Sequence, residues 1–456
     1  MLHDTLVRGG TVVFPERGPE DADILIRDGR IAAVLSPGGP APDTADTIDA
    51  NGLHIFPGII DAHIHFGFAE PITEYTTETT YAAQGGVTTV LAYFLKNEAY
   101  SEIFAEQKAE AEARAFVDFG FHFSTARDVH AEEINTYVGE LGVTSFKYFM
   151  NFKGEEGRYL GLDGTDDGFF LDLLERTAAH EGVVVVAHPE NIEIVSRIRR
   201  QFQEEGRDTF RDFCESKPIF TEVENMVRGM MFAEHTGASI YFPHVSCADG
   251  LDEVRRYRAR YGDIYVETCP HYLTHTMDMD MGSLGKTNPP LRTQADVEAV
   301  WEAIADGTVD VVASDHVPRK RATKEGKNIW QSSQGFPGTA TILPVLLSEG
   351  YHKRGLDLQT IAEVVCTNPA AIFGIGERKG AIAVGMDADL TLVDLGKERE
   401  VVPAELGSYS DYSIYEGWTL KGWPVRTIVR GLTVMQDGKM IDATAGHGRY
   451  LHRPLR

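Results

Sequence analysis

Short runs of apolar and β-branched residues recur along the middle of the chain and alternate with amphipathic segments. Several runs are almost continuously apolar, which is typical of parallel strands covered on both faces. Between them, segments rich in Glu, Ala and Arg, such as 98–114 and 250–261, predict helices. The predicted strands fall in the runs 54–66, 86–94, 116–124, 143–152, 182–188, 238–244, 263–271 and 309–316.

Eight strand–helix units in succession predict an α/β fold of the (β/α)8 TIM-barrel type, and a doubly wound open sheet is the alternative. The two ends of the chain have a different texture, with short strand-like runs joined by glycine-containing turns, as in LVRGGTVV and GAIAVGMDADLTLVDL. Neither end alone has enough strands to bury a face, so we expect them to pair. The prediction is a small discontinuous, β-sandwich-like domain from residues 1–56 and 376–456, and a catalytic barrel over 57–375.

The composition narrows the class of protein. The chain has 456 residues and a formal net charge of −26, so its field would repel nucleic acid. No apolar run approaches the ~20 residues of a membrane span, and the first residues lack the pattern of a signal peptide. The cysteines show no CxxC spacing, which suits a reducing compartment, and we expect a cytoplasmic protein. They are Cys214, Cys247, Cys269 and Cys366.

Polar residues with metal-binding chemistry stand at the ends of the predicted strands. Two histidines at i and i+2 close the first strand, and both rings project to one side because side chains alternate along a strand. In a parallel barrel the carboxyl ends of all strands meet at one mouth, where catalytic residues are found. The residues expected to converge there are His63, His65, Lys147, His188, His244 and Asp315.

Each of these residues also has a structural interpretation. A single histidine at a strand end is usually a core or surface residue, Lys147 could extend outward to solvent, and Asp315 could cap a helix. The structural account requires all these interpretations to hold together, so a joint metal site is favoured. Lys147 is the unusual member, because an ammonium group has no lone pair. Once buried, however, it loses its proton easily, and a neutral amine reacts with carbon dioxide to give a carbamate that could bridge two metal ions.

The motifs that carry these residues resemble the cyclic amidohydrolases of the amidohydrolase superfamily, a group that includes dihydropyrimidinases, hydantoinases, allantoinases and dihydroorotases. The resemblance covers nearly the whole chain. The segments SKPIFTEVE (216–224), KTNPPLR (286–292) and KEGKNIW (324–330) are more similar to allantoinases, whereas GFPGTATILPVLLSEG is equally similar to hydantoinases. The matching motifs are GIIDAHIHFG (58–67), SFKYFMNFKG, VVAHPEN, FPHVSC, CPHYL and ASDHVP.

The resemblance implies a hydrolase that opens a ring C–N bond of a cyclic amide, imide or ureide. His63 and His65 would bind one divalent metal ion and His188 and His244 a second, with Lys147 as a bridging N6-carboxylysine formed with CO2. Asp315 would complete the first metal site and act as general base and then general acid for a metal-bridging hydroxide. Zinc suits the ligands, and manganese, cobalt or iron could also bind. Such relatives are commonly homotetramers or dimers.

Several positions depart from the family pattern and bear on the substrate. Hydantoinases and dihydropyrimidinases have a tyrosine five residues after the bridging lysine, whose hydroxyl helps to hold the oxyanion, but this chain has Phe152. Losing one such donor costs about 3 kcal/mol of barrier. Asn288 replaces a common serine that touches the ring, and Gly335 is the third residue expected at the substrate. Gly67 replaces the arginine with which dihydroorotases grip a carboxylate, which disfavours that activity.

These departures predict an altered substrate, larger or more apolar, and we expect Phe66, Phe94 and Tyr148 near strand ends to contribute to its pocket. His271 and Asn191 have either a pocket or a structural role. The C-terminal segment 443–456 is expected to pack against another subunit. The alternatives are an allantoinase, an amidohydrolase of another reaction class, and a non-catalytic scaffold relative, which should bind no stoichiometric metal.

Overall fold

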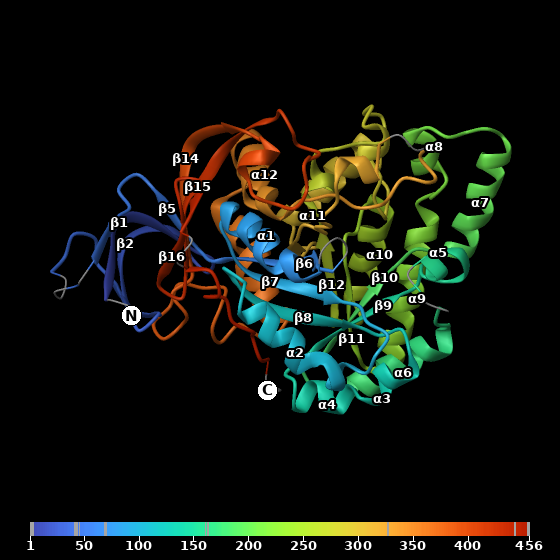
Figure 1. Cartoon of the computed structure of the whole chain (residues 1–456), viewed down its shortest axis with the longest axis horizontal. Coiled ribbons are helices and arrows are strands. Elements are labelled where there is room, and N and C mark those ends of the chain that lie inside the picture. Colours follow the sequence, from blue (N-terminus) through green and yellow to red (C-terminus); the bar gives the residue numbers. More distant parts are fainter. Residues whose placement is uncertain are drawn as a thin grey trace.

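Eight parallel strands follow one another around a barrel in the order of the sequence (Figure 1). The computed structural model describes residues 4–40, 44, 46–67, 71–159, 161, 164–325, 328–441 and 444–453. The barrel strands are β6 (Ile59–His65), β7 (Val87–Phe94), β8 (Asp118–Ser124), β9 (Ser145–Phe149), β10 (Val184–His188), β11 (Ser239–Phe242), β12 (Ile264–Thr268) and β13 (Val311–Val312).

The ring closes between the first strand and the segment after the last one. The backbone N–H of His65 donates to the carbonyl of His316 at 2.8 Å, and that of His316 donates to the carbonyl of His63 at 3.3 Å. A doubly wound sheet would instead reverse its strand order at a switch point. The unbroken order and the closure confirm the predicted (β/α)8 barrel.

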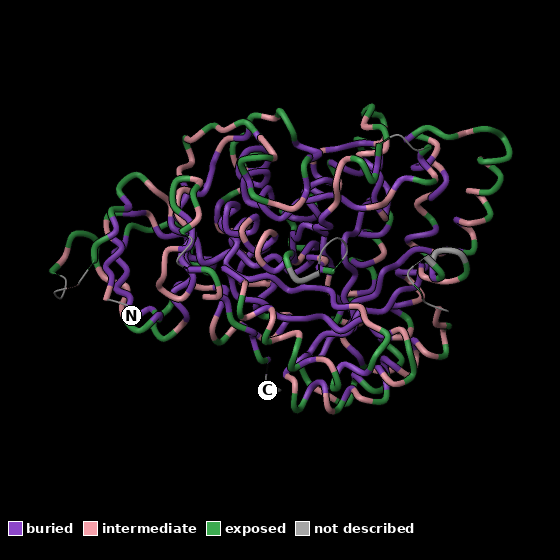
Figure 2. Tube along the Cα trace, viewed as in Figure 1, coloured by how far each residue is buried: buried purple, intermediate pink, exposed green. Residues whose placement is uncertain are grey.

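Helices follow the barrel strands and cover the outside of the ring, so that the strands are buried while exposure is concentrated on the periphery (Figure 2). The predicted helices over 98–114 and 250–261 correspond to α2 and α10, each with slightly different ends. Among the described residues, no helix is long and apolar enough to cross a membrane. The helices are α1 (Pro71–Gln84), α2 (Tyr100–Glu112), α3 (Asp128–Glu132), α4 (Ile134–Gly139), α5 (Gly154–Tyr159), α6 (Asp167–Ala178), α7 (Ile192–Glu204), α8 (Phe210–Glu215), α9 (Phe220–Thr236), α10 (Ala248–Arg258), α11 (Gln294–Ala305), α12 (Ile342–Val345), α13 (Leu358–Ala362) and α14 (Asn368–Ile372).

The two ends of the chain form one separate, mainly antiparallel sheet beside the barrel (Figure 1). The halves meet where β5 pairs antiparallel with β14, with Pro57 opposite Leu390. The predicted pairing of the two ends is therefore confirmed, whereas the domain boundaries stay a prediction. The strands are β1 (Thr5–Phe14), β2 (Gly18–Arg27), β3 (Arg30–Leu35), β4 (Asp46–Asp49), β5 (His54–Pro57), β14 (Leu390–Glu400), β15 (Thr419–Val429), β16 (Leu432–Gln436) and β17 (Lys439–Met440).

The described part of the C-terminal segment, residues 444–453, packs on its own barrel. The Tyr450 ring stacks on Phe121 with centroids 5.7 Å apart. Arg453 is fully buried and donates to Ser145 Oγ at 2.8 Å and to the carbonyl of Phe121. These side chains have partners within their own chain, and the expected contact of this segment with another subunit stays a prediction.

Candidate metal centre

The six predicted ligands lie at the carboxyl end of the barrel and line one cavity of about 690 Å³. Two of them end their strands and two follow theirs, while His63 and Lys147 each lie two residues before a strand end. Because parallel strands of a barrel all end at the same face, residues far apart in sequence become neighbours here. They are His63 and His65 of β6, Lys147 of β9, His188 of β10, His244 after β11 and Asp315 after β13.

Two of the six have an uncommon backbone conformation. His244 and Asp315 have φ values of 46° and 49°, in the left-handed region that non-glycine residues rarely adopt. Such conformations persist where the surrounding structure holds them, and they cluster at functional sites. The backbone N–H of His244 is held by Glu267 Oε1 at 3.1 Å, which fixes this turn.

His63, His65 and Asp315 form the first half of the centre. Their potential ligand atoms all lie within 4.8 Å of one another. Asp315 Oδ1 is 3.0 Å from His63 Nε2 and 3.1 Å from His65 Nε2, and the two Nε2 atoms are 3.2 Å apart. Two imidazoles and a carboxylate converging on one point are a donor set for a divalent metal ion.

His188 and His244 form the second half. Nδ1 of His188 lies 2.9 Å from Nε2 of His244, and both side chains are buried. The His244 ring is also close to the first half, with its centroid 5.5 Å from that of His63. The structure therefore brings the two histidine pairs together as neighbours in one cavity.

Lys147 points into the cavity rather than outward to solvent. Its side chain is buried, and Nζ lies 4.6 Å from the ring centroid of Tyr93 and 5.4 Å from that of Phe149. Among the described residues none accepts a hydrogen bond from this amine. Burial lowers the pKa of Lys147 to about 8, although Asp315 and Glu267 oppose the shift. A neutral amine is therefore accessible near physiological pH.

Glu267 of β12 is a buried carboxylate that the sequence analysis did not single out. It accepts hydrogen bonds from His63 Nδ1 at 2.6 Å, from the Tyr241 hydroxyl at 2.7 Å and from the backbone of His244 at 3.1 Å. A proton held on Nδ1 leaves Nε2 of His63 as a lone-pair donor toward the cavity. Glu267 thus orients the side chain of His63 in the first half of the centre and the backbone of His244 in the second half.

Glu190 plays the same part for the other histidine pair. Its Oε2 lies 2.6 Å from His188 Nε2, which leaves Nδ1 of that ring facing His244. Its second oxygen, Oε1, accepts from Lys217 Nζ at 2.7 Å. Both Glu190 and Glu267 are ionisable residues at or beside the end of a buried strand, and that position is the sequence signal that could have found them.

The pKa values of His63, His65 and Asp315 indicate a site in which a metal ion could replace a proton. Burial opposes protonation of His63, but Glu267 and Asp315 outweigh it and raise the pKa of His63 to about 9. Burial lowers the pKa of His65 to about 4, so that this ring is neutral. His63 and His65 hold the pKa of Asp315 well below its usual range against the effect of burial. A metal ion would replace the His63 proton between these groups.

The three residues expected at the substrate, Phe152, Asn288 and Gly335, all line the same cavity. Phe152 stacks on Phe149 with ring centroids 4.5 Å apart. Asn288 Nδ2 donates to Gln334 Oε1. Gly335 has a φ of 81°, and a Cβ there would lie 2.6 Å from a methyl carbon of Val317. This wall of the cavity therefore requires a glycine.

Phe66, Phe94 and Tyr148 do not line the cavity, which overturns their expected role. Phe66 packs on Tyr75 and Phe94 on Phe121, in the layer between strands and helices. The ring of Tyr148 stacks on Phe170 of α6 at 4.3 Å. These residues follow inward-facing neighbours, so the alternation of a strand turns them outward. Among the four aromatic residues, only Phe152 supports an apolar substrate.

Asn191 and His271, for which the sequence allows either a pocket role or a structural role, do not line the cavity. Asn191 caps α7, since its side chain accepts from the backbone of Ile194 at 3.3 Å, which is a structural role. His271 is buried and packs edge-on against Phe336 with centroids 4.9 Å apart. Burial lowers the pKa of His271 to about 3, so that it is neutral.

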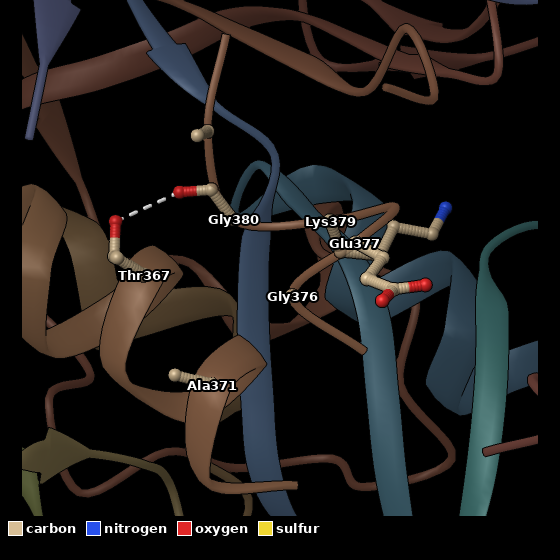
Figure 3. A pocket seen from close by; sticks show the side chains of 7 residues that line it. Thr367, Ala371, Gly376, Glu377, Lys379 and Gly380 are labelled. Atoms are coloured by element: carbon tan, nitrogen blue, oxygen red, sulfur yellow. Dashed lines mark hydrogen bonds between the residues drawn. The ribbon is translucent and has the colours of Figure 1, made fainter. Parts of the chain in front are cut away.

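A second cavity, of about 430 Å³, lies between α14 and the segment 376–381 (Figure 3). Its lining is mainly Ala and Gly, and Thr367 Oγ1 donates to the carbonyl of Gly380 at 2.8 Å, drawn as the dashed line. The cation in its lining, Lys379, binds Asp118 at 2.6 Å and Asp389 at 2.5 Å. These ion pairs join the barrel to the small sheet, so the residues of this cavity serve the fold.

Comparison with known proteins gives matches over almost the whole chain. The sequence profile of the amidohydrolase family matches residues 54–434. An allantoinase of Rubrobacter xylanophilus is 36% identical, over 97% of this chain and 96% of its own. A D-hydantoinase of Rhizobium radiobacter is 32% identical, over 96% of this chain and 97% of its own. The solved structure of an L-hydantoinase (dihydropyrimidinase) from Arthrobacter aurescens superposes with a TM-score of 0.91 at 30% identity, covering 99% of both chains.

Proposed function

Because this chain belongs to the amidohydrolase family, we propose that it is a metal-dependent hydrolase that opens the ring C–N bond of a cyclic amide, imide or ureide. Relatives named allantoinase and D-hydantoinase, each at least 32% identical, both act on such rings by name. The observation that carries the proposal is the convergence of four histidines, an aspartate and a buried lysine on one cavity. The enzyme is similar to hydantoinases and dihydropyrimidinases.

The donor set fits two divalent metal ions. His63 and His65, each through Nε2, and Asp315 would hold one ion. His188 through Nδ1 and His244 through Nε2 would hold the other. The nitrogen and oxygen donors suit zinc best, and manganese, cobalt or iron(II) can also occupy such sites. When bound, the ions lower the pKa of water and polarise the substrate carbonyl.

Lys147 would bridge the two ions as N6-carboxylysine. Its lowered pKa makes a neutral amine available, and that amine attacks CO2 to form an N–C bond with release of one proton. The product has two oxygens in place of an ammonium group, which suits a position between two cations.

Asp315 is the proton carrier of the reaction. Its pKa is held well below the usual range, so it is ionised and able to accept the proton of the attacking water. The water oxygen adds to the carbonyl carbon, the ring C–N bond breaks, and Asp315 returns the proton to the departing nitrogen. The products are a carboxylate and an amine or ureide. Glu267 and Glu190 hold the imidazoles in the tautomers that this geometry needs.

A substrate panel on metal-reconstituted enzyme tests the function. Hydantoins, dihydropyrimidines, allantoin and cyclic imides should each be assayed for ring opening. Allantoin is the second candidate substrate, because three of the matched relatives, at 33–36% identity, are named allantoinases. Turnover of allantoin alone would contradict a hydantoinase-like substrate. Elemental analysis addresses the scaffold alternative, since a scaffold should bind no stoichiometric metal.

We further propose a homo-oligomer, a tetramer or dimer, working in the cytoplasm. Two large apolar side chains of α9, Phe220 and Met231, are each 54% exposed, which suits a subunit contact. The four cysteines are free and buried, as in a reducing compartment. Light scattering coupled to size-exclusion chromatography measures the number of subunits.

A further inference from the structure

Asn151 is a buried carboxamide in the wall of the metal-site cavity, and it has no hydrogen-bond partner among the residues that the structure describes. Asn151 is only 3% exposed, and its Oδ1 is buried and unpaired. Among the described residues, none forms a hydrogen bond with its Nδ2 either. Folded proteins pair nearly all their buried polar groups, so an orphaned carboxamide at a cavity indicates a partner that enters from the cavity.

The register of β9 directs this side chain toward the site. Lys147, Phe149 and Asn151 alternate along the strand and its extension, so they share one face. Pairing continues past the end of the strand, where the backbone N–H of Met150 donates to the carbonyl of His188 at 3.3 Å. Asn151 accordingly lines the cavity together with Lys147 and His188.

The neighbouring positions cannot supply the same polar groups. Phe152 has no donor or acceptor and stacks on Phe149. Asn288, another carboxamide of the cavity, already uses its Nδ2 on Gln334 and has only its Oδ1 unpaired. Asn151 is the carboxamide of this pair that offers both a donor and an acceptor to a ligand.

We propose that Asn151 recognises the ring of the substrate, by pairing its carboxamide with a ring amide whose N–H and C=O lie on the same edge. This inference rests on the proposed function. A ring forces its amide into the cis form, which places donor and acceptor side by side, as they are on a carboxamide. Asn151 therefore selects cyclic amides, imides and ureides with a free N–H beside a carbonyl, and it is a substrate-binding residue of the reaction.

The test compares rings with and without that N–H. Metal-loaded wild-type enzyme and Asn151→Ala are assayed on dihydrouracil and hydantoin and on the analogues methylated at each ring nitrogen. The control is Asn51→Ala, at an exposed asparagine in the turn between β4 and β5. Asn151→Asp keeps the size and an acceptor but removes the donor. Metal content and the midpoint of thermal unfolding are measured for every variant.

Loss of a buried hydrogen-bonding pair should lower kcat/KM of Asn151→Ala on the unmethylated rings by about tenfold to a hundredfold. For one of the methylated analogues, wild type and variant should be nearly equal, with metal content unchanged. Wild-type kcat/KM in Asn151→Ala, an equal loss on all rings, or loss of metal would overturn the inference. If wild-type enzyme opens none of the rings, the proposed function itself fails, and the inference fails with it.

Discussion

Replacing Glu267 by Gln removes the negative charge of this side chain but keeps its size and shape. Glu267 is fully buried and accepts three hydrogen bonds, of which the one from His63 Nδ1 is short, at 2.6 Å. Gln keeps an oxygen for His63 but removes the negative charge that makes this bond charge-assisted. It also faces the Tyr241 hydroxyl with a donor in place of an acceptor. We therefore expect His63 to become a weaker and less firmly oriented ligand.

The magnitude follows from the position of Glu267 behind a ligand. Removing such a partner typically lowers metal affinity tenfold to a hundredfold, which corresponds to about 1.4–2.7 kcal/mol. The effect should fall on an ion held by His63 and His65, because Gln keeps an oxygen for the backbone of His244. On the other side, Glu190→Gln removes the charge behind His188 and should weaken the second ion instead. The two variants are reciprocal tests of one idea.

The assay is metal binding by the chelator-treated protein. Zinc is titrated in competition with a chromophoric chelator, and bound metal is counted by elemental analysis. The wild type should show two ions, and each variant should show one ion with reduced affinity and one unchanged. Glu349→Gln is the matched control, because Glu349 is a buried carboxylate paired with Lys353 at 2.8 Å and does not line the cavity. Wild-type affinity for both ions in Glu267→Gln would refute the reasoning.

Three further predictions concern the same centre. Lys147→Ala should abolish activity and lower the bound metal, with partial recovery of turnover in millimolar short-chain carboxylic acids; full activity and metal content would show that the bridging role is wrong. Asp315→Asn should keep metal, measured by elemental analysis, but lower kcat by about 10²- to 10⁴-fold, because the proton carrier is lost. Glu190 has its pKa lowered from 4.5 to about 2 by Lys217 and His188 against the effect of burial. Its contribution to stability is therefore complete above pH 4.5 and decreases as the pH falls toward 2. Between pH 5 and pH 3 the free energy of unfolding in urea should fall by about 2 kcal/mol more for the wild type than for Glu190→Gln, and equal losses would contradict this.

The barrel and the six candidate ligands could be predicted because their signals are local. Buried parallel strands are almost continuously apolar, so the eight runs mark the eight strands. Carboxyl ends of barrel strands converge for geometric reasons, so a polar residue at each end is already placed. Neither inference needs knowledge of which side chains touch.

The predictions that are wrong concern side chains whose placement depends on which face of a strand they lie on. Phe66, Phe94 and Tyr148 were expected at the cavity because they lie near strand ends, but each follows a residue that faces inward. Tyr148 follows Lys147 in this way, and strict alternation along the strand would have turned it outward. Glu267 could have been found from its place near the end of a buried strand, but its role depends on a contact with His63, 204 positions away, which no local pattern encodes.

The charges of the centre favour a carboxylated lysine. Two divalent ions would bring four positive charges to a buried site, and Asp315 and Glu267 supply two negative ones. Glu190 adds none, since Lys217 neutralises it at 2.7 Å. An ammonium group on Lys147 would raise the excess to three buried positive charges, a neutral amine would leave two, and a carbamate would leave one. Because uncompensated buried charge is costly, binding of the two proposed ions would itself drive Lys147 toward the anionic form. Metal binding and lysine carboxylation should therefore be mutually dependent, so that apoprotein given zinc in CO2-depleted buffer gains activity only when bicarbonate is added.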